Sequence, residues 1–122
     1  MNKTRENLAI ALDLIKTEGW AVANLQDKES GGYCLLGAIY AARTGKRDLE
    51  NFTEDGYQDS PEVDAVAVVL RNIGQVNEDR LNRFREDGEL YALVYGFNDM
   101  TGRRIEEVID VLSKAIEAAG QA

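Results

Sequence analysis

Apolar residues recur at spacings of three and four along most of this chain, and this helical period constrains the fold more than any other feature. The clearest stretch follows Thr101, which we expect to cap a helix that ends at Gly120. One face of that helix carries Ile105, Val108, Ile109, Leu112, Ala115, Ile116 and Ala119. The same period over residues 4–18 predicts a first helix, and Gly19 is placed to end it.

Three further helices are indicated by local signals. A second helix is expected from about Tyr33 to Gly45, and it is apolar on almost every side, which is typical of a buried central helix. The pair Ser60-Pro61 predicts the start of a third helix, with serine as N-cap and proline at the first position, and Gly74 is expected to end it. A short helix fits residues 78–85.

The apolar run LYALVYGF at residues 90–97 fits either a buried strand or a buried helical turn. We favour helix or irregular structure, because the chain offers no second strand to pair with it and a lone strand is not stable. The sequence therefore predicts an all-α fold: a compact bundle of about five short helices forming a single domain over residues 1–122. A chain of this length can bury a modest core without metals or disulfides.

Charge and composition exclude several functions. The 122 residues hold 14 Lys and Arg against 22 Asp and Glu, a net charge of −8, so we expect no direct nucleic-acid binding, which requires clustered cations. No apolar stretch is long enough to cross a membrane, and the N-terminus does not resemble a signal peptide, so a cytoplasmic location is expected. Self-association through an uncovered apolar helix face stays open.

The chain has no histidine and a single cysteine. The missing histidine removes the usual general base near neutral pH, the commonest zinc ligand and the partner of a Ser-His or Cys-His catalytic pair. One cysteine cannot form an intramolecular disulfide or a multi-cysteine metal site. We therefore expect no metal, no cofactor and no conventional catalytic residue.

Cys34 is the one candidate nucleophile. It lies near the expected start of the second helix, where the helix dipole and free N–H groups favour a thiolate. The competing interpretation is a small buried residue on an apolar helix, because free cysteine is among the most buried residue types.

Asn98 and Asp99 follow the apolar run and precede the last helix. Adjacent amide and carboxylate side chains could bind a ligand or a cation. The same residues also form hydrogen bonds with backbone amides in turns, and the sequence favours this structural role.

Seven acidic residues fall between positions 48 and 64 with no basic residue among them. If they share a surface, they could attract a partner with a basic groove, although the pattern by itself favours a solvated loop that keeps the protein soluble. The candidate partner-binding residues in this acidic segment are Asp48, Glu50, Glu54, Asp55 and Asp59.

Three short motifs occur in a recognisable order: Gly19-Trp20, then the run from Gly32 to Ala38 (GYCLLGA), then Phe97-Asn98-Asp99. In this order the chain resembles a family of small proteins of unknown function from actinobacteria and their phages, including mycobacteriophages. The resemblance implies a shared helical fold and singles out Cys34, Asn98 and Asp99 as a set, which we expect to pack together. In one departure from the family pattern, Arg104 stands where a threonine cap is usual.

Taken together, the sequence favours a non-enzymatic interaction protein that binds a host or phage macromolecule through the segment 48–64. The alternative is a cysteine-dependent enzyme or a small-ligand-binding protein that uses Cys34 with Asn98 and Asp99.

Overall fold

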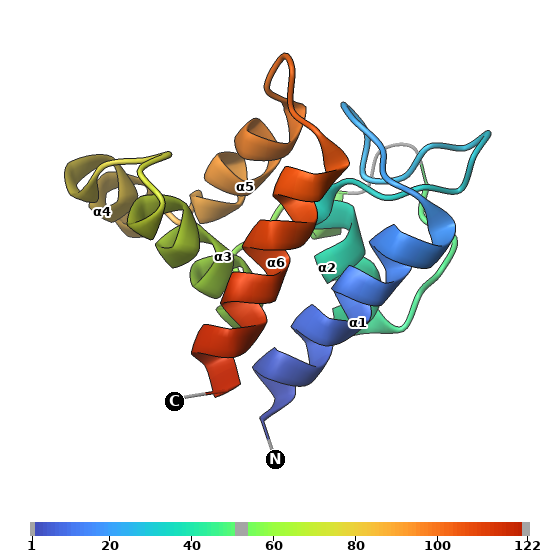
Figure 1. Cartoon of the computed structure of the whole chain (residues 1–122), viewed down its shortest axis with the longest axis horizontal. Helices are drawn as coiled ribbons and strands as arrows, with labels where there is room; N and C mark the ends of the chain where they lie inside the picture. Colours follow the sequence, from blue (N-terminus) through green and yellow to red (C-terminus); the bar gives the residue numbers. More distant parts are fainter. Residues whose placement is uncertain (1, 51–53, 121–122) are drawn as a thin grey trace.

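The fold is all-α, as the apolar period predicts. The structure is a computed structural model that describes residues 2–50 and 54–120, and within these ranges it contains six α-helices and no strand (Figure 1). The helices are α1 Lys3–Glu18, α2 Leu35–Thr44, α3 Pro61–Asn72, α4 Glu78–Glu86, α5 Leu90–Asp99 and α6 Ile105–Gly120, with a short 3-10 turn, η1, at Glu54–Gly56. About five helices were predicted, and the sixth is α5, which forms over the ambiguous run 90–97.

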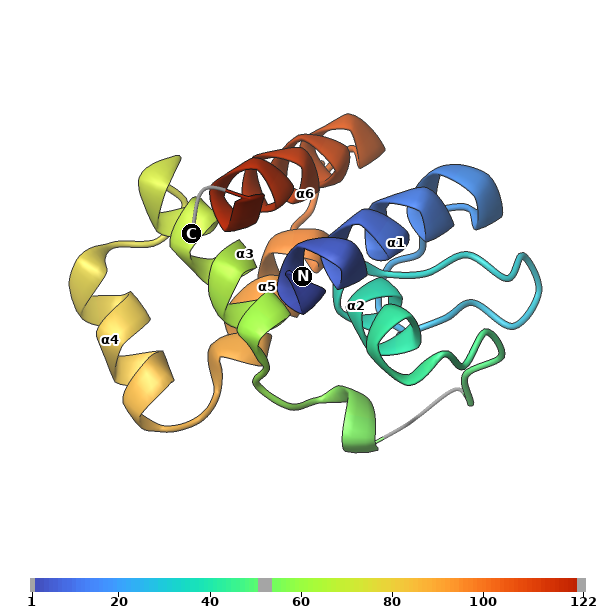
Figure 2. The same ribbon diagram turned by 90° about the horizontal axis from the view of Figure 1, so that it is seen from below.

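The long helices α1 and α6 lie side by side and run in opposite directions, so the start of α1 and the end of α6 lie at the same end of the molecule (Figures 1 and 2). Helix α1 also packs on α2, and α3 packs on α5 and α6. Helix α4 lies at the side of the molecule away from α1, where it packs against α3 and α5. None of the helices in the described ranges is both long and apolar enough to span a membrane.

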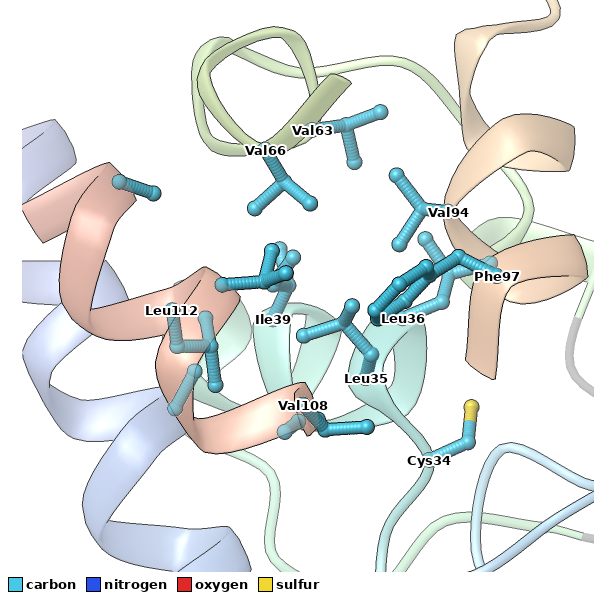
Figure 3. Close-up of a cluster of buried hydrophobic side chains, with 14 of the residues drawn as sticks. Cys34, Leu35, Leu36, Ile39, Val63, Val66, Val94, Phe97, Val108 and Leu112 are labelled. Carbon is cyan, nitrogen blue, oxygen red and sulfur yellow. The ribbon is translucent and has the colours of Figure 1, made fainter. Parts of the chain in front are cut away.

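Helix α2 is the centre of the core, in agreement with its apolar sequence. Every residue from Leu35 to Ala42 is buried. Valine and leucine side chains of α3, α5 and α6 surround it together with Phe97, while Cys34 lies at the edge of this cluster (Figure 3). The core therefore forms where one helix that is apolar all round is enclosed by the single apolar faces of its neighbours.

The predicted start of α3 is confirmed. The Ser60 side chain accepts a hydrogen bond from the Val63 N–H at 3.1 Å, and Pro61 occupies the first helical position. Gly74, with φ of 82°, follows the last residues of the helix.

The prediction that Thr101 caps the last helix is wrong. Helix α6 begins at Ile105, after a turn in which Gly102 has φ of 83°. Glu107 instead accepts a hydrogen bond from the Arg104 N–H at 2.9 Å, which is half of a capping box. The Arg103 guanidinium holds this turn, because it lies 3.8 Å from the Phe97 ring centroid and donates to the Phe97 carbonyl at 2.8 Å.

Helix α2 can sit this close to the preceding loop only because it contains Gly37. A Cβ at this position would lie 2.0 Å from the Leu25 carbonyl oxygen, far inside van der Waals contact. Leu25 and Gly37 are both buried, so neither backbone can shift without disturbing the packing around it. Gly37 therefore sets the distance between α2 and the loop at residues 20–33.

This contact predicts opposite effects for two helical glycines. Gly37→Ala should lower the free energy of unfolding by about 1 to 3 kcal/mol, because the new methyl group must displace the Leu25 backbone. Gly96→Ala, within α5, meets no atom within 4 Å and should raise stability by roughly 0.5 to 1 kcal/mol through helix propensity. Urea denaturation measures the free energy of unfolding of both variants. If both substitutions raised it, or both lowered it by the same amount, the packing of Gly37 on Leu25 would be contradicted.

Candidate functional site

The loop between α1 and α2 folds back on itself, so that its two ends lie together. Tyr33 donates its N–H to the Gly19 carbonyl, and Ala21 donates to the Tyr33 carbonyl, both at 2.9 Å. Cys34 donates to the Leu25 carbonyl at 3.1 Å. The segment Gly19-Trp20 thereby meets the segment that opens α2. The backbone bonds of Tyr33 explain why α2 starts at Leu35, two residues later than expected.

Asn98 joins these segments to α5. Its side chain is fully buried, and its Oδ1 accepts hydrogen bonds from the Trp20 indole N–H at 2.6 Å and from the Leu35 N–H at 3.0 Å. Its Nδ2 donates to the Ala21 carbonyl at 3.1 Å and to the Asp99 carboxylate at 2.8 Å. These four bonds use the full hydrogen-bonding capacity of an amide side chain.

Asp99 fixes the next part of the loop. Its Oδ1 accepts a hydrogen bond from the Ala23 N–H at 3.0 Å. Ala23 has φ of 75°, the only positive φ at a residue other than glycine in the described chain. This conformation costs about 1 to 2 kcal/mol for an L-residue, so the bond to Asp99 helps to hold a strained backbone.

Cys34, Asn98 and Asp99, which we expected to pack together, come into one region, where the Asn98 side chain accepts a hydrogen bond from the Leu35 N–H at the start of α2. Cys34 takes a different partner. It is the N-cap of α2, and its Sγ accepts a hydrogen bond from the Gly37 N–H at 3.2 Å.

The helix start does not activate Cys34. Its side chain is 3% exposed, and burial raises the pKa of the thiol to about 12, against an opposing effect of the Gly37 N–H. The carboxylate of Asp99 adds to the increase. Cys34 is therefore a neutral thiol at physiological pH, and burial outweighs the helix dipole.

A cavity of about 270 Å³ opens beside these residues, and we call it the tyrosine cavity. It is lined by Ala23, Asn24, Leu25, Cys34, Tyr57, Tyr95 and Asp99. Two of the three residues singled out as a set, Cys34 and Asp99, thus face a common space. Asn98 does not line it, because its polar atoms are all bound to the protein.

Two aromatic rings form one side of the tyrosine cavity. Tyr57 and Tyr95 meet edge to face, with ring centroids 6.0 Å apart, and Tyr91 packs 6.2 Å from each of them. Burial raises the pKa of the Tyr57 hydroxyl, and the negative charge of Asp99 acts in the same direction. Tyr57 therefore faces the cavity as a neutral phenol.

The acidic segment divides into two parts with different surroundings. Asp59, Glu62 and Asp64 contact other parts of the protein. Asp59 accepts hydrogen bonds from the N–H groups of Leu90 and Tyr91, at 3.1 and 2.9 Å, and so caps α5. Glu62 is buried and pairs with Arg43 at 2.7 Å, and Asp64 pairs with Arg85 at 3.1 Å.

The other four acids, Asp48, Glu50, Glu54 and Asp55, have exposed side chains. In the sequence they lie between α2 and α3, before Tyr57. Of the predicted partner-binding residues, Asp59 has an internal role, because it caps α5.

No group of three or more acidic or cysteine side chains that could hold a metal ion occurs in the part of the chain that the structure describes. Asp110, which shares a helix face with Glu106, instead forms an ion pair with Lys114.

Sequence reasoning missed three contributors to this region. The indole N–H of Trp20 has a specific acceptor in the Asn98 side chain. The buried amide of Gln26 ties the loop to the chain after α2, through the carbonyls of Gly31 and Arg47 and the N–H of Leu49. Tyr57 and Tyr95 are 38 positions apart, so no local pattern shows that they meet.

A comparison with protein-family models now places the chain. A model described as "Family of unknown function (DUF6197)" matches residues 1–118. The chain belongs to this family. No curated protein and no solved structure matches the chain. The DUF6197 match covers α1 to α5 and α6 as far as residue 118, including the motifs that meet at Asn98.

The buried, neutral state of Cys34 has a measurable consequence. With its pKa raised from 9.0 to about 12, the thiolate fraction at pH 8 is about a thousandfold lower than for an ordinary cysteine. We expect a disulfide reagent such as DTNB to react very slowly with the native protein and to titrate one thiol rapidly after unfolding in guanidinium chloride. A native reaction as fast as that of the unfolded chain would contradict this description and revive the cysteine-dependent alternative.

Proposed function

We propose that this DUF6197 protein acts by binding a protein partner that presents a basic surface, with the exposed acids Asp48, Glu50, Glu54 and Asp55 as its contact region. The observation that carries the proposal is the division of the acidic segment. Three of its acids serve the fold, whereas these four are exposed within eight consecutive positions.

Charge of one sign on a surface acts at a distance. It attracts an oppositely charged protein before contact and increases the association rate, and the effect weakens as salt shortens the range of the field. The net charge of −8 strengthens this preference for basic partners. In keeping with the family resemblance, we place the partner in the cytoplasm of an actinobacterial host or among the proteins of its phage.

A cysteine-dependent reaction has less support. The thiol is buried and neutral, and the chain offers no histidine to remove its proton. Binding through surface charge needs neither a nucleophile nor a cofactor.

The test compares two variants with the same change in net charge. The first carries Asp48→Asn, Glu50→Gln, Glu54→Gln and Asp55→Asn. The second carries Asp79→Asn, Glu86→Gln, Asp87→Asn and Glu89→Gln, which are exposed acids on and after α4. Partners captured from an actinobacterial lysate by the wild type are identified and then purified, and their affinities are measured at rising salt.

We expect the first variant to bind the purified partner at least tenfold more weakly and with a smaller salt dependence, while the second stays within about twofold of the wild type, since surface potential acts mainly within a Debye length of about 10 Å. If both variants lost the same affinity, the interaction would depend on net charge alone, and the proposed contact region would be refuted. Unchanged binding by the first variant would refute the proposed contact region.

A further inference from the structure

We propose that the tyrosine cavity is a binding site for a primary alkylammonium group. This inference is independent of the partner-binding role of the acidic segment. It rests on the carboxylate of Asp99, the rings of Tyr57 and Tyr95 and the apolar wall at Leu25, which enclose one space of about 270 Å³.

The size of the cavity limits the occupant. Pockets for drug-sized ligands typically measure about 300 to 1,000 Å³, so this one lies just below that range. It suits a small head group on a short chain and excludes a nucleotide or a large cofactor.

The charge of the cavity favours a cation. Among the described residues that line it, Asp99 is the only one with a charged side chain, and none is a lysine or an arginine. Its Oδ1 is occupied by Ala23 and Asn98, whereas its Oδ2 makes no hydrogen bond with the described residues. A cation in the cavity can therefore bind Oδ2 without breaking the bonds that hold the loop.

The tyrosine rings add attraction for the same class of ligand. The rings of Tyr57 and Tyr95 stand nearly perpendicular to each other, at 85°, and both line the cavity together with the Asp99 carboxylate. An ammonium group over an aromatic face is attracted by the electron density of the ring, and partial removal from water strengthens this attraction. The neutral phenol of Tyr57 adds no competing charge to this wall.

The available acceptor favours ammonium over guanidinium. Guanidinium groups bind carboxylates best through two parallel hydrogen bonds to both oxygens. Asp99 Oδ1 already accepts two hydrogen bonds, so only Oδ2 is left to bind a ligand. A single acceptor suits an ammonium group, because its N–H donors are compact and rotate freely. The alkyl stem would then lie along Leu25 and Ala23.

Such a group could belong to a free amine or to a lysine side chain of a protein, and two probes separate these sources. The first is n-butylammonium, and the second is a lysine residue blocked at both ends, Nα-acetyl-lysine N-methylamide. Binding is followed by two-dimensional NMR at neutral pH, through the Ala23 amide and the Trp20 indole N–H. Uncharged n-butanol, negatively charged butyrate and n-butylguanidinium are the matched ligand controls.

We expect saturable shifts of the Ala23 amide with n-butylammonium, at least fivefold weaker binding of n-butylguanidinium, and no saturation with n-butanol or butyrate. Comparable binding of blocked lysine identifies a site open to protein side chains, and much weaker binding identifies a site for free amines; either result supports the ammonium site. Equal affinity for n-butanol, or no saturable shift with either amine, would overturn the proposal.

Two variants locate the site. Asp99→Asn keeps an oxygen for the N–H groups of Ala23 and Asn98 but removes the charge, and it should weaken n-butylammonium binding about tenfold or more. Asp79→Asn makes the same charge change on an exposed side chain of α4, outside the cavity, and should leave binding within twofold.

Tyr95→Leu provides a second test if Asp99→Asn does not fold, because Tyr95 is a partly exposed residue on the surface of α5. It removes the ring and keeps an apolar side chain, so binding should fall severalfold. Unchanged affinity in a folded Asp99→Asn or Tyr95→Leu protein would place the amine elsewhere and refute the site.

Discussion

The buried side chain of Asn98 is the interaction on which the rest of this structure depends. One amide at the end of α5 satisfies the indole of Trp20, the carbonyl of Ala21 and the first N–H of α2, which lie 63 to 78 positions before it in the chain. In a core of low polarity each of these groups would otherwise remain without a partner, at a cost of about 1 to 3 kcal/mol apiece. Asn98 therefore positions the α1–α2 loop, the start of the central helix and the end of α5 relative to one another.

The tyrosine cavity is a consequence of this arrangement. Asn98 brings the loop to the end of α5, and Asp99 then holds Ala23 in its strained conformation through the neighbouring bond. Gly37 allows the loop to touch α2 at Leu25. Among the residues that line the cavity, Ala23 and Leu25 are thus held by backbone contacts, while Tyr57 and Tyr95 come from other parts of the chain. A site held in this way is largely formed before a ligand arrives.

The sequence predicted the helices well because their signals are local. The apolar period, the Ser60-Pro61 start and the glycine stops act within a few residues of one another. The start of α6 was predicted wrongly because Arg103 binds the ring and carbonyl of Phe97. This contact holds residues 100–104 in a turn, so the helix begins at Ile105 and not after Thr101. Family resemblance placed Cys34, Asn98 and Asp99 in one group, but only the structure shows that Asn98 binds the protein while Asp99 and Cys34 face a cavity. Burial, which decides the state of the thiol, cannot be inferred from its place at a helix start.

The free energy of unfolding of Asn98→Ala, measured by urea denaturation, tests the central role of Asn98 most directly. Asn72→Ala, at an exposed asparagine near the end of α3, serves as the matched control. We predict that Asn98→Ala loses more than about 3 kcal/mol or fails to fold, because several buried groups lose their partner, while Asn72→Ala changes stability by less than about 0.5 kcal/mol. A loss below about 1 kcal/mol for Asn98→Ala would contradict this account.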